Sequence, residues 1–168
     1  IKPIPVLSDN YAWLLTTPEG VRAIVDPGEA GPILDEIGDG RLDMILLTHH
    51  HADHTAGTEA LRERYGAQVY GPRQKQEWLP RLDHAVEDGD VVSLGNTQIQ
   101  VLSTPGHAVG HVSYVVAEVP ALFCGDVLFS LGCGRLLEGT AQELFDSLHR
   151  YDSLPDSTLV CAGHEYTR

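Results

Sequence analysis

The sequence predicts a single α/β domain in which strands and helices alternate along the chain. Short apolar or alternating segments recur between turn residues, as is typical of strands. Segments that favour helices lie between several of these strands. The chain has 168 residues, which is close to the usual size of one domain and enough to bury a good core.

The first half of the chain is expected to begin with strands at residues 4–7 and 11–17. Glu19-Gly20 predicts a hairpin turn into a third strand at residues 22–25. The apolar run Met44-Ile45-Leu46-Leu47 is bounded by turn signals and predicts a buried strand. The other elements expected here are a short helix at 32–37, a clearer helix at 55–65, a strand at 67–70 and a helix at 73–79.

The second half is richer in strands. Thr140-Ala141-Gln142-Glu143 resembles a capping box and predicts a helix that continues to His149. Residues 159–161 are a further strand-like run. The other strands expected here lie at residues 91–94, 98–103, 112–116 and 121–124.

Composition excludes several classes of function. A formal net charge of −13 argues against a nucleic-acid partner, because phosphate binding needs clustered Lys and Arg. No stretch of eighteen apolar residues occurs and no leader opens the chain, so neither a membrane span nor export is expected. The three scattered cysteines, Cys124, Cys133 and Cys161, are expected to be reduced thiols, with Cys124 and Cys161 in the core. We therefore expect a cytoplasmic protein.

A histidine-rich segment follows the strand at residues 44–47. It contains His49, His51, Asp53 and His54 in an H-x-H-x-D-H pattern. Imidazole and carboxylate ligands suit zinc, and they also suit iron or manganese. A solvated His-rich turn or a tag is the alternative interpretation, but a tag would lie at a terminus and would lack the aspartate. The pattern predicts a metal site.

Three more candidate ligands occupy equivalent places after other predicted strands. His107 follows the strand at 98–103, Asp126 follows the strand at 121–124, and His164 follows the strand at 159–161. Each lies after or near a glycine, which allows backbone and ion to approach closely. Alone, each would be interpreted as a structural histidine or a capping aspartate. Their repeated placement at strand ends indicates a shared site.

These residues together resemble the metallo-β-lactamase superfamily. The resemblance implies a four-layered αβ/βα sandwich of two mixed sheets with outer helices, and a binuclear centre at one edge. It implies that His49, His51 and His107 hold one metal, that Asp53, His54 and His164 hold the second, and that Asp126 bridges them together with a hydroxide. Two divalent ions are therefore expected, zinc first, with iron or manganese as alternatives.

Narrower motifs resemble glyoxalase II, the hydroxyacylglutathione hydrolases. They run through nearly the whole chain in the family's order, and they are Ser8-Asp9-Asn10-Tyr11, Val25-Asp26-Pro27-Gly28, the GCGR-x-x-EGT segment at residues 132–140 and Gly163-His164-Glu165-Tyr166-Thr167. The resemblance implies hydrolysis of S-D-lactoylglutathione to D-lactate and glutathione, which completes methylglyoxal detoxification. It places Arg135 and Tyr166 at glutathione contacts. The expected partner is thus a small glutathione thioester, bound by a monomer.

The implied chemistry needs no serine or cysteine nucleophile. Two dications that share a water lower its pKa toward neutrality, and one of them can polarise the thioester carbonyl. Asp53 is expected to be the catalytic residue that orients the hydroxide in addition to binding metal. His111 is expected to support its neighbours without binding metal. His50, His84 and His149 are not expected to be ligands.

Two departures from the family pattern bear on substrate binding. Glyoxalase II carries a helical C-terminal domain after GHEYT, and this chain stops at Arg168, so residues 1–168 are expected to form the catalytic domain alone. Leu137 also replaces an aromatic residue common at its position. The alternatives left open are a mononuclear iron persulfide dioxygenase, a metal-loaded fragment that turns nothing over, and a lactamase or lactonase.

Overall fold

The computed structural model describes residues 1–166 and folds as two mixed β-sheets packed face to face. The first sheet has six strands in sequential order. They are β1 (Lys2–Val6), β2 (Asn10–Thr16), β3 (Arg22–Val25), β4 (Met44–Leu46), β5 (Gln68–Pro72) and β6 (His84–Val86). Strands β1 to β3 form an antiparallel meander, and β3 to β6 run parallel. Pro3 and Pro5 are tolerated because β1 is an edge strand.

The second sheet has five strands in the order β13-β10-β9-β8-β7. They are β7 (Val91–Leu94), β8 (Thr97–Ser103), β9 (Val112–Val116), β10 (Ala121–Gly125) and β13 (Leu159–Ala162). Pairing is antiparallel from β7 to β10 and parallel between β10 and β13. A small hairpin is made by β11 (Leu128–Phe129) and β12 (Gly132–Cys133).

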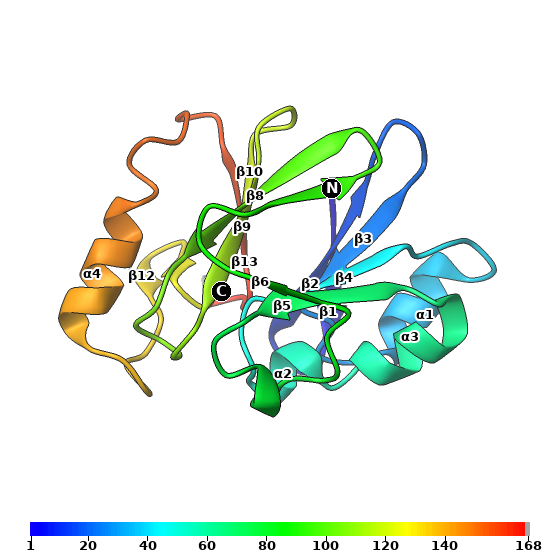
Figure 1. Cartoon of the computed structure of the whole chain (residues 1–168), viewed down its shortest axis with the longest axis horizontal. Helices are drawn as coiled ribbons and strands as arrows, with labels where there is room; N and C mark the ends of the chain where they lie inside the picture. The colour runs from blue at the N-terminus through cyan, green and yellow to red at the C-terminus, as the bar shows by residue number, and fades with distance from the viewer. Residues whose placement is uncertain (167–168) are drawn as a thin grey trace.

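Helices cover the outer faces of the two sheets (Figure 1). On the first sheet lie α1 (Gly31–Ile37) and α3 (Thr58–Tyr65), and the short α2 (Ala52–Thr55) precedes α3. On the far side of the second sheet lies α4 (Ala141–His149). The order helix, sheet, sheet, helix confirms the four-layered sandwich expected from the sequence.

Side-chain alternation along the strands builds the cores. In β4, Met44 and Leu46 point into the core between the sheets, and Ile45 points to the outer core under α1 and α3. From the second sheet, Tyr114 and Phe123 fill the central core and are completely buried. Because both faces of β4 are covered, the segment that follows it is held rigidly.

Two expected helices differ from the observed structure. The helix expected at 55–65 begins earlier, as α2, and breaks at Gly57 before α3. Gly57 donates its N–H to the Pro27 carbonyl at 2.8 Å, and a Cβ there would lie 2.8 Å from that oxygen. This backbone contact interrupts the helix. The helix expected at 73–79 is wrong: only one 3₁₀ turn, Gln76–Trp78, forms, because Lys75 has φ +63°.

The capping box predicted at the start of α4 is confirmed. The Thr140 hydroxyl accepts a hydrogen bond from the Glu143 N–H, and the Glu143 carboxylate accepts one from the Thr140 N–H at 2.7 Å. Thr140→Ala is expected to lower the free energy of unfolding by about 1 kcal/mol. Urea denaturation checks this, with Gln142→Ala on the same helix as the control. An unchanged stability for Thr140→Ala would contradict the assigned cap.

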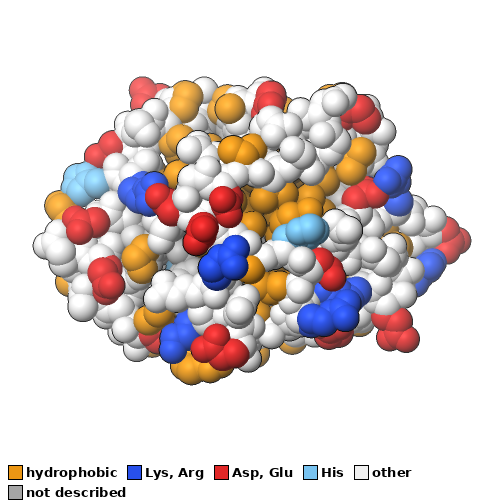
Figure 2. All heavy atoms as spheres, viewed as in Figure 1, with side chains coloured by type: hydrophobic (Ala, Val, Ile, Leu, Met, Phe, Trp, Pro, Cys, Tyr) orange, Lys and Arg blue, Asp and Glu red, His pale blue; other side chains and the backbone are white. Residues whose placement is uncertain are grey.

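The surface carries charges of both signs. On the face in view in Figure 2, acidic and basic side chains are interspersed, and no continuous blue patch occurs. Within residues 1–166, no helix combines the length and apolar character needed to cross a membrane.

Candidate metal centre

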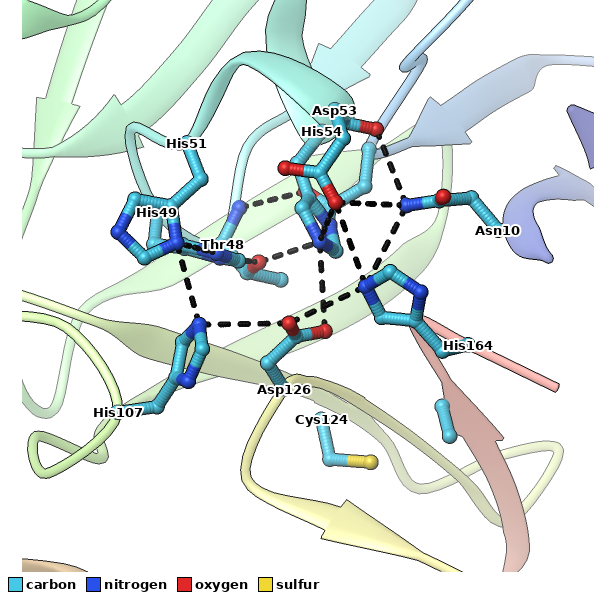
Figure 3. Close-up of polar contacts among 12 residues, drawn as sticks. Asn10, Thr48, His49, His51, Asp53, His54, His107, Cys124, Asp126 and His164 are labelled. Atoms are coloured by element: carbon cyan, nitrogen blue, oxygen red, sulfur yellow. Dashed lines mark hydrogen bonds and ion pairs between the residues drawn. The ribbon is translucent and has the colours of Figure 1, made fainter. Parts of the chain in front are cut away.

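All seven predicted ligands meet at one edge of the sandwich (Figure 3). His49 and His51 follow β4, and Asp53 and His54 lie on α2. The remaining three lie after strands or between them: His107 between β8 and β9, Asp126 directly after β10, and His164 directly after β13. The two sheets therefore contribute to the centre from opposite sides.

The first donor set consists of three imidazoles. His51 Nδ1 lies 3.1 Å from His49 Nε2 and 3.1 Å from His107 Nε2. Nitrogens bound 2.0–2.1 Å from one tetrahedral zinc ion are about 3.3 Å apart. These two distances are close to that spacing, and the ligand atoms of all three residues lie within 4.8 Å of one another.

The second donor set consists of Asp53, His54 and His164, whose ligand atoms lie within 4.8 Å of one another. Asp53 Oδ2 is 3.3 Å from His164 Nε2 and 3.5 Å from His54 Nε2. Asp126 lies between the two sets. Its Oδ1 is 3.3 Å from His54 Nε2, and its Oδ2 is 3.3 Å from both His107 Nε2 and His164 Nε2.

The outward nitrogen of each of the five imidazoles faces an oxygen atom. The pairs are His49 Nδ1 with Thr48 Oγ1 (2.9 Å), His51 Nε2 with Glu138 Oε1 (2.8 Å), His54 Nδ1 with Asp26 Oδ2 (3.0 Å), His107 Nδ1 with the Arg135 carbonyl (2.9 Å) and His164 Nδ1 with Asp9 Oδ1 (3.2 Å). Since carbonyls and carboxylates only accept, each such partner assigns the proton to the outward nitrogen. In the neutral form of each ring, the inward nitrogen then presents its lone pair to the centre.

Asp26 is a functional residue that the sequence analysis named only as part of the Val25-Asp26-Pro27-Gly28 motif, with no role of its own. Its buried carboxylate accepts hydrogen bonds from the Thr48 N–H (2.8 Å), the Thr48 hydroxyl (2.6 Å) and His54 Nδ1 (3.0 Å). Its backbone has φ +51°, a strained value for a residue with a side chain. Asp26 therefore fixes both the strand end and the orientation of His54.

Asn10 and Asp9 also hold the second set, through the pairing of β2 with the segment around His164. The Asn10 amide donates to Asp53 Oδ2 at 3.0 Å, and Asn10 pairs with His164 in an isolated β-bridge. These residues were visible in the sequence only as part of the Ser8-Asp9-Asn10-Tyr11 motif. Asp9 and Asn10 are far in sequence from Asp53 and His164, so no local pattern indicated that these residues are in contact.

His111 contacts its neighbours as expected and lies outside the donor sets. It is fully buried, stacks on His49, accepts a hydrogen bond from the Asp126 N–H at 3.3 Å and contacts Thr104 Oγ1 at 3.0 Å. Burial lowers the pKa of His111 to about 3 and also lowers the pKa of His49. Both rings are therefore neutral at physiological pH.

The carboxylates of Asp53 and Asp126 favour positive charge at the second donor set. Burial opposes a charge on His164, but hydrogen bonds with Asp126 and Asp53 outweigh it and raise the pKa of His164 to about 10. The hydrogen bond with His164 in turn holds the pKa of Asp53 well below its usual range. The second donor set is thus a place where a cation is stabilised.

Unpartnered atoms show that the residues present fit metal ions. Among residues 1–166, His54 Nε2 and Asp126 Oδ1 are buried and have no well-formed hydrogen bond, although they lie 3.3 Å apart. Leaving such groups unpaired costs about 1–3 kcal/mol each. A cation between the two atoms would satisfy both of them, so the donor chemistry and the geometry agree.

A cleft of about 420 Å³ opens over the centre. Arg135, Leu137 and Tyr166 line it, as do Phe129 and Cys133, for which the sequence predicted no place at the site. Tyr166 stacks on the His164 ring, with centroids 4.9 Å apart. Thr167 of the GHEYT motif lies outside the described residues.

The other histidines and the cysteines lie outside the two donor sets. His84 and His149 are exposed. His50 contacts Trp78 and Glu138 beside the first donor set and does not join it. The three cysteines are free; Cys124 and Cys161 are buried as expected, and Cys133 is exposed at the cleft.

The chain is similar in sequence and in fold to known proteins. The family model described as the metallo-beta-lactamase superfamily matches residues 7–164. A hydroxyacylglutathione hydrolase of Rhodobacter capsulatus is 49% identical over 170 residues, which cover 99% of this chain and 66% of that protein. The chain thus spans slightly less than two thirds of that relative's length.

Two solved structures share the fold. The BLEG-1 B3 metallo-β-lactamase superposes with a TM-score of 0.90 at 29% identity, covering 98% of this chain and 91% of that one. TTHA1623, solved in a di-iron-bound form, gives a TM-score of 0.86 at 31% identity, covering 98% of this chain and 92% of that one.

Proposed function

The chain belongs to the metallo-β-lactamase superfamily, and from this premise we propose that residues 1–168 form the catalytic domain of a glyoxalase II-type thioester hydrolase. The proposed reaction is hydrolysis of S-D-lactoylglutathione to D-lactate and glutathione. The observation that carries the proposal is the pair of donor sets joined by Asp126, in a chain 49% identical to a hydroxyacylglutathione hydrolase.

In this proposal His49, His51 and His107 would hold one divalent ion, Asp53, His54 and His164 would hold a second, and Asp126 would serve both sets. Zinc is the first expectation, and the same ligands suit iron or manganese. When bound, such ions supply a hydroxide nucleophile at neutral pH and an electrophile for the thioester carbonyl. The related structure TTHA1623, solved in a di-iron-bound form, supports two metal ions per chain.

The chain's own residues position the reactants. The Asp53 side chain is 41% exposed at the cleft, while Asn10 holds its Oδ2, so its carboxylate can orient an attacking water. Attack forms the new C–O bond and breaks the C–S bond. The glutathione thiolate is a good leaving group, so no strong general acid is required.

The cleft wall supplies the substrate contacts. Arg135 carries the positive charge expected to pair with a glutathione carboxylate, and Tyr166 and Leu137 offer apolar surface beside it. The exposed Leu137 leaves the wall thinner than an aromatic residue would.

Arg135→Ala is expected to raise the KM for S-D-lactoylglutathione about tenfold or more with little change in kcat. Hydrogen bonds to charged groups contribute about 1.5–3 kcal/mol, and 1.4 kcal/mol corresponds to tenfold. The His107 contact survives, because it uses the Arg135 backbone carbonyl. Steady-state kinetics checks this, with the exposed Arg81→Ala as the control. An unchanged KM would contradict the assigned contact.

The experiment that tests the proposed function is thiol release from S-D-lactoylglutathione under argon, with the metal content counted in the same preparation. We expect turnover without oxygen at two metals per chain, and its loss in His54→Ala. Activity that needs oxygen and a persulfide substrate would favour the dioxygenase alternative instead. Full metal loading without thiol release would also overturn the proposal.

A further inference from the structure

Residues 134–139 form a wall of the cleft that is seated tightly at both ends. A Cβ on Gly134 would lie 1.8 Å from the Asp126 carbonyl oxygen, and one on Gly139 would lie 2.7 Å from Gly106 Cα. Gly139 also donates its N–H to the Gly106 carbonyl at 3.1 Å. Only glycine permits these approaches, so the wall has a fixed position next to the centre.

Between these glycines, the wall supplies acceptors to two of the three imidazoles in the first donor set. The Arg135 carbonyl contacts His107 Nδ1 at 2.9 Å, and Glu138 Oε1 contacts His51 Nε2 at 2.8 Å. The same segment therefore lines the cleft with Arg135 and Leu137 and orients the rings behind it.

The Glu138 carboxylate has further partners besides His51. Its Oε1 also lies 3.0 Å from His50 Nε2, and its Oε2 accepts a hydrogen bond from the Val109 N–H at 3.0 Å. The side chain is only 23% exposed. Donors from two separate segments hold the carboxylate in place, unlike in an isolated surface pair, where the side chain stays mobile.

We propose that Glu138 is a positioning residue for the first donor set and couples that set to the substrate wall. This inference rests on the proposed function, since it concerns how the chain would hold the first metal. A neutral imidazole has two tautomers, and only a proton on His51 Nε2 leaves the Nδ1 lone pair facing His49 and His107. The Glu138 carboxylate, 2.8 Å from His51 Nε2, selects that tautomer and fixes the orientation of the ring.

The test is a competitive chelator titration of zinc-loaded protein, which resolves the affinities of the two sites. In Glu138→Ala we expect one site to weaken about 10–100-fold and the other to be unchanged. Glu138→Gln is expected to recover part of this loss, because its amide oxygen can still accept from His51 Nε2. Glu63→Ala, an exposed glutamate on α3, is the matched control and should leave both affinities unchanged.

The Glu138 variants distinguish a positioning role of this residue from a role in folding stability. They also distinguish failure of the inference from failure of the proposed function. Unfolding of the metal-free Glu138→Gln variant should match that of the parent chain, while the KM for the thioester rises as the wall loosens. If the parent chain binds two zinc ions and Glu138→Ala keeps both affinities, the inference is overturned and the proposed function stands. If the parent chain itself binds no zinc, both are overturned.

Discussion

Replacing Asp126 with asparagine is expected to abolish thioester hydrolysis and to reduce the number of bound metals. The Asp126 carboxylate is 6% exposed and lies 3.3 Å from ligand nitrogens of both donor sets. Asparagine keeps the shape of the side chain but removes its negative charge and turns an N–H₂ group toward the imidazoles. We expect a loss of activity larger than the ~10²–10³-fold that follows removal of one transition-state contact.

Metal analysis and kinetics on the same protein samples check this expectation. Asp152→Asn is the matched control, because its carboxylate is 71% exposed and pairs with the surface residue His149. A variant at position 126 that retains two metals and near-normal turnover would show that Asp126 does not join the two donor sets.

The second large effect is expected for Gly28→Ala. A Cβ on Gly28 would lie 1.9 Å from the Asp53 carbonyl oxygen and 2.8 Å from the Asp53 carbonyl carbon. Backbone atoms cannot rotate away as a side chain does, so α2 must shift. Overpacking of this kind costs about 1–3 kcal/mol or more. Because Asp53 and His54 lie on α2, we also expect weaker binding of the second metal.

Gly31→Ala provides the control within the same segment. A Cβ at Gly31 meets no atom within 4 Å, and this position lies at the start of α1. Alanine there is expected to leave stability unchanged or raise it by up to about 1 kcal/mol. Urea denaturation of both variants, with and without zinc, measures the difference. Equal stability of the two variants would contradict the assigned contact between Gly28 and α2.

The strands were predictable because alternation is a local signal. Residues 44–47 were predicted as a buried strand, and Met44–Leu46 forms β4 with both faces covered. The short strand β6 was missed, because residues 84–86 are too few to show an alternating pattern and are held by pairing with β5. Pairing of that kind is a tertiary effect that local patterns do not carry.

The helix errors have the same origin. The break between α2 and α3 depends on a hydrogen bond from Gly57 to Pro27, thirty residues away. Nothing within residues 55–65 signals that contact. The consequence matters for the centre, because Asp53 and His54 lie on the separate helix α2, before the helix that the sequence predicted at 55–65.

The candidate ligands could be named from the sequence, but the residues that orient them could not. His49, His51 and His54 are close in sequence, and the resemblance supplied the grouping of the distant ligands. Thr48 is adjacent to His49, but other hydrogen-bond partners are remote: Asp26 is 28 residues from His54, and Glu138 is 87 residues from His51. Only the folded chain brings these pairs together.

We propose that the two donor sets joined by Asp126 hold two metal ions. Anomalous diffraction from crystals of the zinc-loaded protein measures the number and the positions of the bound ions. We expect two peaks per chain, one among His49, His51 and His107 and the other among Asp53, His54 and His164, with Asp126 next to both. A single peak, or peaks away from these residues, would show that the two donor sets do not form a binuclear centre.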